Sequence, residues 1–381
     1  MSVPVEPLDS GRFGVSPERG FLPDDDPLSS FEDRDHSFLV RLDELGRTLP
    51  ALLKGGELAA AVEDLDAPPS SLYDDLTTRE LERVYGVTGF LANAYVHGTG
   101  GRSNVIPSGI AIPLYESTAR LGRTPALSYD AYVLHNWEQV NPDAGLTPHN
   151  VRSITNFVDM RDEQWFIAVH VAIEAMAGPA VAAIGDARTG MAEGDPERVE
   201  IALRTMEDAL SGLITILDRM PEHNHPEKYG RGFRPYLMAL TNVEYEGVDE
   251  LDGPQSFRGG SGAQSSVFPA LDAALGIDQG DNPLVTHLRE LRADMPTEHK
   301  AFIDALGEGP SIHEYVSASD DETLREAYNE VIDRMVRFRD LHVDVVRQYL
   351  TEPLDEDQGT GGTPYGPFLE MFIENTEGMR L

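Results

Sequence analysis

The sequence predicts an all-α protein with a small N-terminal helical domain and a larger C-terminal helical domain. Apolar residues at helical spacing dominate from about Phe31 onward. No segment shows a sustained alternation of apolar and polar residues, which is the pattern of a half-buried strand. A chain of 381 residues can bury a sizeable core in one large or two moderate domains. We expect the two domains at residues 1–125 and 126–381.

The N-terminal domain begins with an expected irregular segment. Residues 1–30 are rich in Pro, Asp and Gly, and "LPDDDPLSS" is typical of turns. Two helices are predicted next, in "DHSFLVRLDELGRTLPALL" and "TTRELERVYGVTGFLANAYVHG". Thr77 or Thr78 is the expected N-cap of the second helix, because acidic residues follow in its first turn. The Gly- and Pro-rich residues 100–113 are expected to form an irregular link.

The C-terminal domain contains a series of longer helical patterns. Its most apolar run, residues 165–184, carries His170, Glu174 and a Gly-Pro break, which favours a buried core helix over a membrane span. The main helices are predicted at residues 128–140, 164–184, 195–220 and 322–350, with shorter apolar segments in "FRPYLMALTN", "QSSVFPALDAALG" and "NPLVTHLRELRADM".

The formal net charge of -36 limits the possible partners. A surface this acidic repels phosphate backbones, so we expect no nucleic-acid partner. The acidic excess is spread along the chain, which is typical of a solvated surface such as that of a protein adapted to high salt. The N-terminus "MSVPVEPLDSGRFG" lacks the basic-then-apolar order of a secretory signal, so we expect a cytoplasmic protein with no membrane partner.

The absence of cysteine limits the possible chemistry. It excludes disulfides, thiolate-ligated haem, c-type haem attachment, iron–sulfur clusters and a cysteine nucleophile. Any metal must therefore be held by His, carboxylate, Tyr or Met side chains.

His342 lies in the middle of an apolar stripe on the long helix at 322–350. A histidine on such a face is most often a core residue satisfied by a hydrogen bond, but histidine is also the commonest metal ligand. Both interpretations stay open from the pattern alone. The stripe, at alternating spacings of three and four, consists of Tyr328, Val331, Met335, Phe338, His342, Val345 and Tyr349.

His170 and Glu174 lie one turn apart on the same face of the most apolar helix. Buried polar side chains need partners. The two residues could ligate a non-haem iron or zinc ion. His170 could instead face a ligand pocket as a distal histidine, or the pair could simply satisfy its own hydrogen bonds inside a bundle.

Two glycine-rich loops and one arginine are further candidates. "SFRGGSGAQSS" (256–266) lacks the Gly-Lys-Ser/Thr of a phosphate loop, but its glycines would let the backbone approach a ligand closely. "DEDQGTGGTPYG" (355–366) resembles a mobile lid. Flexible connection is the alternative for both loops. Arg234 opens an apolar segment and could bind a substrate carboxylate through two hydrogen bonds, although surface arginines are common at helix starts.

Five motifs occur in the order found in the indoleamine 2,3-dioxygenase family of haem enzymes, and the chain resembles that family over nearly its whole length. Weaker similarity begins near "GFLPDDDPLSSF". The resemblance implies an all-α fold in which a small N-terminal domain lies over a large domain that holds haem b. The five motifs are "NVIPSGIAIP", "LSYDAYVLHNW", "FRGGSGAQSSVFPALDAALGI", "LREAYNEVIDRMVRFRDLHVDVVRQYL" and "GTGGT".

The resemblance assigns roles to residues around the haem. It implies that His342 is the proximal iron ligand and that Arg339 lies beside a haem propionate with Asp272 as its acidic partner. Residues matching the pocket wall or the loop next to the haem are Tyr129, Tyr132, Val133, Ser261, Gly262 and Ala263.

Other matched residues are expected to bind the substrate. Phe166 matches the aromatic side chain that packs on the indole, and Arg234 matches the arginine that pairs with the amino acid carboxylate. Thr360 matches the lid threonine near the substrate ammonium group, and Gly262 and Ser261 lie in the loop that approaches the substrate.

Two residues depart from the family pattern. His170 occupies a position that is serine in the better-known animal members, and a histidine there resembles the tryptophan 2,3-dioxygenases, where it accepts the indole N–H. Tyr229 stands where phenylalanine is usual and is followed by Gly230. The tyrosine edge at position 229 would favour a polar or substituted indole as substrate.

The implied reaction is cleavage of the indole C2–C3 bond of L-tryptophan by O2, giving N-formylkynurenine as in tryptophan catabolism by the kynurenine pathway. Such an enzyme needs an electron donor that keeps the iron ferrous. Three alternatives stay open: a haem oxygenase acting on another indole or aromatic amino acid in secondary metabolism, a non-haem metal protein that uses His170 and Glu174, and a non-catalytic indole or haem carrier.

Overall fold

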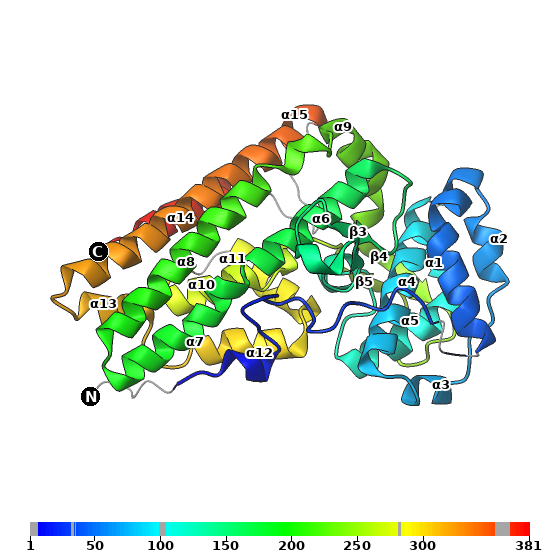
Figure 1. Cartoon of the computed structure of the whole chain (residues 1–381). Coiled ribbons are helices and arrows are strands. Elements are labelled where there is room, and N and C mark those ends of the chain that lie inside the picture. The colour runs from blue at the N-terminus through cyan, green and yellow to red at the C-terminus, as the bar shows by residue number, and fades with distance from the viewer. Residues whose placement is uncertain (1–6, 32–33, 35, 99–103, 281–282, 355–365) are drawn as a thin grey trace.

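The structure is a computed structural model in which residues 7–31, 34, 36–98, 104–280, 283–354 and 366–381 are described (Figure 1). Most of these residues are helical, so the predicted all-α class is confirmed. The longer helices are α1 (Ser37–Gly55), α4 (Thr78–Gly98), α5 (Ser108–Leu121), α6 (Arg161–Met176), α7 (Gly178–Glu193), α8 (Pro196–Leu217), α12 (Thr297–Leu306), α14 (Glu322–Val346) and α16 (Gly366–Glu377). The shorter helices are α2 (Leu58–Glu63), α3 (Ser71–Asp74), α9 (Pro226–Lys228), α10 (Val267–Leu275), α11 (Pro283–Leu291), α13 (Ile312–Ser317) and α15 (Glu352–Leu354).

Short strands add two small sheets. Strand β1 pairs in parallel with β4, which pairs antiparallel with β5, and β2 and β3 form a hairpin in which Trp137 faces Ser153. Their lengths of two to six residues are too short for a recognisable alternation in the sequence. The strands are β1 (Val105–Ile106), β2 (Trp137–Gln139), β3 (Val151–Ser153), β4 (Leu240–Tyr245) and β5 (Gln255–Phe257).

Three of the long helices, α4, α8 and α14, begin at polar caps. At the start of α4 the Thr77 hydroxyl accepts a hydrogen bond from the Glu80 N–H at 3.3 Å, and the Glu80 carboxylate accepts the Thr77 N–H at 2.8 Å. This reciprocal capping box agrees with the expected start of the helix. Asp195 caps α8 and Asp321 caps α14 by accepting hydrogen bonds from backbone N–H groups of the first turn.

The predicted helix at 164–184 is two helices, and its break explains the Gly-Pro pair. Pro179 opens α7, where its missing N–H costs nothing. A Cβ on Gly178 would lie 2.6 Å from the Pro17 carbonyl oxygen, so the N-terminal segment packs directly against this break. By length and composition alone, residues 161–193 include a window that could cross a membrane, but 72% of that window is buried inside the protein. This burial is typical of a core helix.

Two clusters of buried apolar residues form the core, and α6 lies between them. The first cluster takes in α1, α4 and α5 but also Ile167, Val171 and residues of β4. The second is built on α7, α8, α10 and α14 and includes Val169 and Ile173. Because α6 packs on both sides, it needs apolar residues around most of its circumference. The N-terminal helices thus share their core with segments beyond residue 126, and the domain boundary at 125 stays a prediction.

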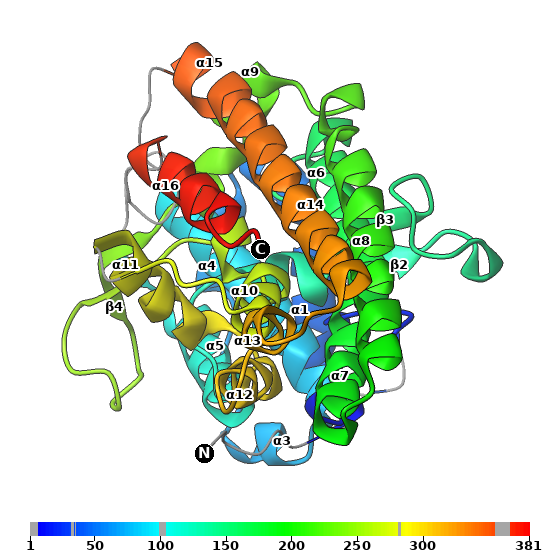
Figure 2. The same cartoon turned by 90° about the vertical axis from the view of Figure 1, so that its left-hand side faces the viewer.

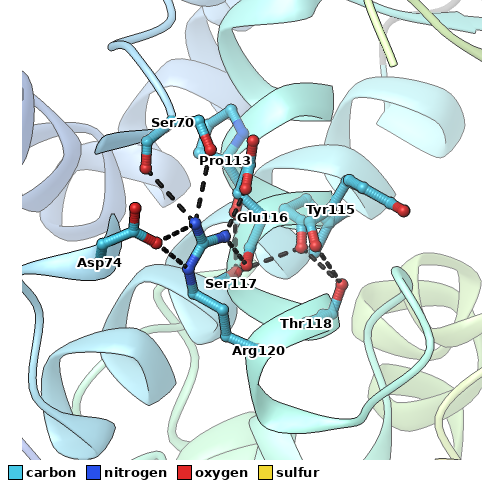
Figure 3. Close-up of polar contacts among 9 residues, drawn as sticks. Ser70, Asp74, Pro113, Tyr115, Glu116, Ser117, Thr118 and Arg120 are labelled. Carbon is cyan, nitrogen blue, oxygen red and sulfur yellow. Dashed lines mark hydrogen bonds and ion pairs between the residues drawn. The ribbon is translucent and has the colours of Figure 1, made fainter. Parts of the chain in front are cut away.

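An exposed ion-pair network joins α3 to α5 in the N-terminal part (Figure 3). The Arg120 guanidinium contacts the carboxylates of Asp74 and Glu116 and lies over the Tyr73 ring at 5.6 Å. Its Nη2 also lies 3.4 Å from the Ser70 carbonyl oxygen. These contacts hold the short helix α3, which is too short to be stable by itself.

Candidate active-site cavity

The described residues line an open cavity of about 550 Å³ between α6, α10, α14 and the loop before α10. A volume of this size is typical of a small-molecule or cofactor site. The sequence-predicted residues that line it are Tyr129, Tyr132, Phe166, His170, Tyr229, Arg234, Ser261, Gly262, Ala263, Asp272, Arg339 and His342.

Two predicted site residues are not among those that line the cavity. Val133 is completely buried in the first apolar cluster, although its neighbour Tyr132 reaches the cavity. Adjacent residues of a helical turn point in different directions, so one of the two must face away. Thr360 lies outside the described residues, as does the proposed lid at 355–366 apart from its last residue.

Three π-helical turns border the cavity, and none of them was predicted from the sequence. They lie at Asp130–Leu134, Tyr229–Phe233 and Arg347–Thr351. Each contributes an aromatic side chain to the cavity wall: Tyr132, Tyr229 and Tyr349. Single π turns are rare and occur frequently at functional sites. No local sequence signal distinguishes them from an ordinary helical turn.

His342 faces the cavity from α14, the long helix that runs beside α8 and α16 (Figure 2). Tyr328, Val331 and Met335 of the same stripe are completely buried. The surface of His342 is instead exposed to the open volume of the cavity. Protein atoms nevertheless surround the residue, because the cavity lies inside the fold. Within the described part of the chain its ring nitrogens have no hydrogen-bond partner. It is therefore not a core histidine satisfied by a neighbouring group.

The protein environment keeps the His342 ring neutral. Burial, then the neighbouring His170 and Arg339, lower the pKa of His342 to about 4. A neutral imidazole with an unused ring nitrogen is the form that ligates iron. The donor set thus fits a haem iron ligand at this position.

The hydrogen bond made by His170 determines which of its nitrogens carries the proton. Nδ1 lies 2.8 Å from the Phe166 carbonyl oxygen, which can only accept, so Nδ1 carries the hydrogen. Burial lowers the pKa of His170, which keeps the ring neutral and leaves Nε2 as a bare acceptor. A Cβ on Gly262 would lie 3.9 Å from this Nε2, so the acceptor lies next to the glycine-rich loop.

Glu174 is engaged with protein groups rather than placed as a metal ligand beside His170. Its Oε1 accepts hydrogen bonds from the Tyr129 hydroxyl at 2.9 Å and the Ser265 hydroxyl at 2.6 Å. Burial raises the pKa of Glu174 to about 7. Among the residues the structure describes, no group of three or more His, Asp or Glu side chains could hold a metal ion. The geometry does not support the interpretation of a non-haem metal pair.

Arg339 lines the cavity and is held by contacts with the C-terminal helix α16. Arg339 Nη2 donates to both Asp272 oxygens, at 2.7 and 2.8 Å. Its Nη1 donates to the Thr376 hydroxyl and lies 3.5 Å from the Phe372 carbonyl oxygen. Asp272 and Arg339 were expected from the sequence, whereas Thr376 and Phe372 were not, since nothing in their local pattern indicates a contact with α14.

Arg234 and a group of aromatic side chains also line the cavity. Arg234 is buried, with 4% of its surface exposed, and directly follows the π turn that carries Tyr229. The Tyr229 ring lies 5.4 Å from Phe166 and 5.8 Å from Tyr349 between centroids. A buried guanidinium next to aromatic rings suits a ligand that has both a carboxylate and a flat apolar part.

Comparison with known proteins agrees with this arrangement. The family model described as "Indoleamine 2,3-dioxygenase" matches residues 9–361. The chain is 31% identical to "Indoleamine 2,3-dioxygenase 1" of Rattus norvegicus over 92% of this chain and 91% of the rat protein. It is 29% identical to "Indoleamine 2,3-dioxygenase" of Saccharomyces cerevisiae, over 93% and 82% of the two chains. It is also 29% identical to "Indoleamine 2,3-dioxygenase acdA" of Aspergillus candidus, over 94% of each.

Proposed function

The chain belongs to the indoleamine 2,3-dioxygenase family of haem-dependent dioxygenases that act on indoles, and on that premise we propose that its substrate is L-tryptophan and its product N-formylkynurenine. One observation carries the proposal. The same cavity brings together a neutral imidazole with an unused nitrogen, a second imidazole that presents a bare acceptor, and a buried guanidinium. These three groups complement iron, an indole N–H and a carboxylate, respectively.

We propose haem b as the cofactor. His342 would ligate the iron, and Arg339, held by Asp272, would lie beside a propionate. Tyr132 and Ala263 would contact the ring system. Bound haem supplies the iron that activates O2, and the protein supplies orientation and electrostatics. The reaction also requires an electron donor that keeps the iron ferrous.

The substrate would lie on the His170 side of the cavity. Arg234 would bind the carboxylate, while Phe166 and Tyr129 would flank the indole. The bare Nε2 of His170 would accept the indole N–H and so orient the C2–C3 bond. Gly262 and Ser261 would line the slot beside His170, and Thr360 is proposed to bind the ammonium group.

The direct test is product formation. The ferric protein is reduced without oxygen and then mixed with L-tryptophan and 18O2. We expect a product whose absorption is that of N-formylkynurenine and whose mass shows two heavy oxygen atoms. A product with one heavy oxygen, or no product, would contradict the proposal.

A different indole is the second candidate substrate, and Tyr229 is the observation that favours it. Tyr229 lines the cavity next to Phe166 and puts a hydroxyl-bearing ring where the family pattern usually has phenylalanine. A panel of ring-hydroxylated tryptophans separates the two candidates. A kcat/KM that is higher for a hydroxylated indole than for L-tryptophan would identify the former as the preferred substrate.

His170→Ala should lower kcat/KM for L-tryptophan roughly 10- to 100-fold, because an indole N–H left without a partner in a dry site costs about 1–3 kcal/mol. The Soret band should be retained. The matched control is 1-methyl-L-tryptophan, which has no N–H and should react at similar rates with wild type and variant. Equal losses for both substrates would show that His170 does not accept the indole N–H.

A further inference from the structure

Gln264 connects two walls of the cavity that are far apart in the sequence. Its side-chain oxygen accepts hydrogen bonds from the Tyr129 N–H at 2.9 Å and from the Ser261 N–H at 3.0 Å. Its side-chain nitrogen donates to Asp294 Oδ2 at 2.8 Å. Gln264 is almost completely buried, with 2% of its surface exposed, so these bonds do not compete with solvent.

The neighbours of Gln264 allow only one orientation of its amide. Two backbone N–H groups require an acceptor on one side, and a carboxylate requires a donor on the other. Asp294 is itself anchored, since its second oxygen accepts the Thr124 hydroxyl. These contacts run from Thr124 to Asp294, from Asp294 to Gln264, and from Gln264 to both Tyr129 and Ser261. We call these five residues the strut.

The loop joined by the strut is confined on its other side by main chain. A Cβ on Gly259 would lie 2.1 Å from the Leu237 carbonyl oxygen, so the loop packs directly against that backbone. The Ser261 hydroxyl accepts the Ala263 N–H at 3.3 Å within the same turn. The position of Gly262 and Ala263 in the cavity therefore depends on the strut.

Tyr129 is held at its other end as well. Its hydroxyl donates to Glu174 Oε1 at 2.9 Å, and Glu174 lies one turn beyond His170 on α6. With the backbone N–H bound to Gln264 and the hydroxyl bound to Glu174, the Tyr129 ring has little freedom to move. The spacing between His170, Tyr129 and the Gly262 loop is thus set by two buried side chains that do not themselves line the cavity.

We propose that Gln264 is a positioning residue that sets the width of the substrate slot between Tyr129 and the Ser261–Ala263 loop. The proposal rests on the proposed function, because it takes this slot to be the place where the indole lies. Gln264 acts through its two backbone partners and does not contact the substrate.

The test is a pair of substitutions that are each harmful alone and compensate for one another. Gln264→Glu places a carboxylate against Asp294, and Asp294→Asn leaves one amide oxygen to serve two donors. In the double variant, the new carboxylate at position 264 accepts both backbone N–H groups and the side-chain N–H of the new amide at position 294. The oxygen of that amide accepts the Thr124 hydroxyl. Every bond of the strut is then restored, and the bond between positions 264 and 294 has its polarity exchanged.

We expect each single variant to raise KM for L-tryptophan about tenfold with a smaller change in kcat, as for the loss of one buried hydrogen bond. The double variant should return to within about twofold of wild type. Hydrogen–deuterium exchange of the apoprotein gives a second measurement. The Tyr129 and Ser261 amides should exchange faster in each single variant and return to wild-type protection in the double variant.

The matched control is Asn150→Asp in the β2–β3 hairpin. Asn150 is also a buried amide that accepts one N–H and donates to two carbonyl groups, but it does not line the cavity. The Asn150→Asp substitution should lower the stability of the protein without changing KM for L-tryptophan. A double variant that stays impaired in both measurements, or an Asn150→Asp variant with the same KM change, would overturn the proposal.

The exchange measurement separates the two proposals. If the wild-type enzyme does not oxidise tryptophan but the amide protection is lost and restored as expected, the proposed function fails and the strut stands as a structural device without the substrate role. If tryptophan is oxidised and the double variant is not rescued, only the strut fails.

Discussion

Replacing His342 with alanine is expected to abolish the Soret band of the purified protein. Alanine offers no ligand, and the absence of cysteine leaves no thiolate to take its place. Among the cavity residues, His342 is the imidazole on α14 whose ring nitrogens have no protein partner in the described structure. The measurement is the absorption spectrum after reconstitution with haem, together with the haem-to-protein ratio.

A second variant keeps this test informative if haem loss also weakens folding. His342→Gly leaves room for free imidazole, which should restore a Soret band when added at millimolar concentration. His149→Ala is the control, because His149 is an exposed histidine of the β2–β3 hairpin, and its spectrum should be that of wild type. A normal spectrum in His342→Ala would show that another residue ligates the iron.

Replacing Glu174 with glutamine is expected to stabilise the protein at alkaline pH. Burial raises the pKa of Glu174 from 4.5 to about 7. Between these two values the folded protein binds a proton that the unfolded chain has released, so the stability contributed by Glu174 falls as pH rises through this window. The full loss is on the order of 3 kcal/mol, of which about 2 kcal/mol falls between pH 5.5 and pH 8.5.

Glutamine mimics the protonated acid, so the unfolding free energy of Glu174→Gln should not fall as pH rises through this window. We expect the difference in unfolding free energy between Glu174→Gln and wild type to grow by about 2 kcal/mol from pH 5.5 to pH 8.5 in urea denaturation. A difference independent of pH would mean that Glu174 is ionised throughout this range.

Glu163 provides the matched control for this substitution. Burial raises its pKa to about 7 as well, but its carboxylate accepts the Phe157 and Val158 N–H groups at 3.0 and 2.8 Å. Glutamine at 163 would set an NH2 group against one of these donors. Glu163→Gln should therefore be less stable than Glu174→Gln at every pH in this range, while its difference from wild type changes with pH in the same direction, because the pKa of Glu163 is raised to a similar value.

The sequence predicted the helices well where periodicity and caps were strong. The α4 cap at Thr77 and the position of α14 are set by local rules, since an N-cap and an apolar stripe depend on residues within a few turns of each other. The same rules could not show the π turns at Asp130–Leu134 and Tyr229–Phe233, because these share the composition of ordinary helix.

The candidate site could be predicted only in part from the residues themselves. The stripe on α14 indicated that His342 points inward but left open whether a neighbouring group satisfies it. For His170 and Glu174, the shared helix face left open a metal pair, a distal histidine and a polar pair satisfied within the bundle. In the structure His170 faces the cavity, and Glu174 binds Tyr129 and Ser265. Resemblance to a known family supplied the roles, and it could not assign one to Gln264 or Thr376.

By itself the sequence determined the helical class, the apolar stripe that carries His342, the absence of thiolate chemistry and the family. These depend on composition and on residues close together along the chain. Only the tertiary structure decided that His342 borders an open cavity, that Nε2 of His170 is a bare acceptor, and that Gln264 ties Tyr129 to Ser261. The bond from the Tyr129 N–H to Gln264 joins partners 135 residues apart, and such a contact leaves no periodic trace in the sequence. The bond from His170 Nδ1 to the Phe166 carbonyl oxygen is local, but the open space beside Nε2 is created by the packing of several segments.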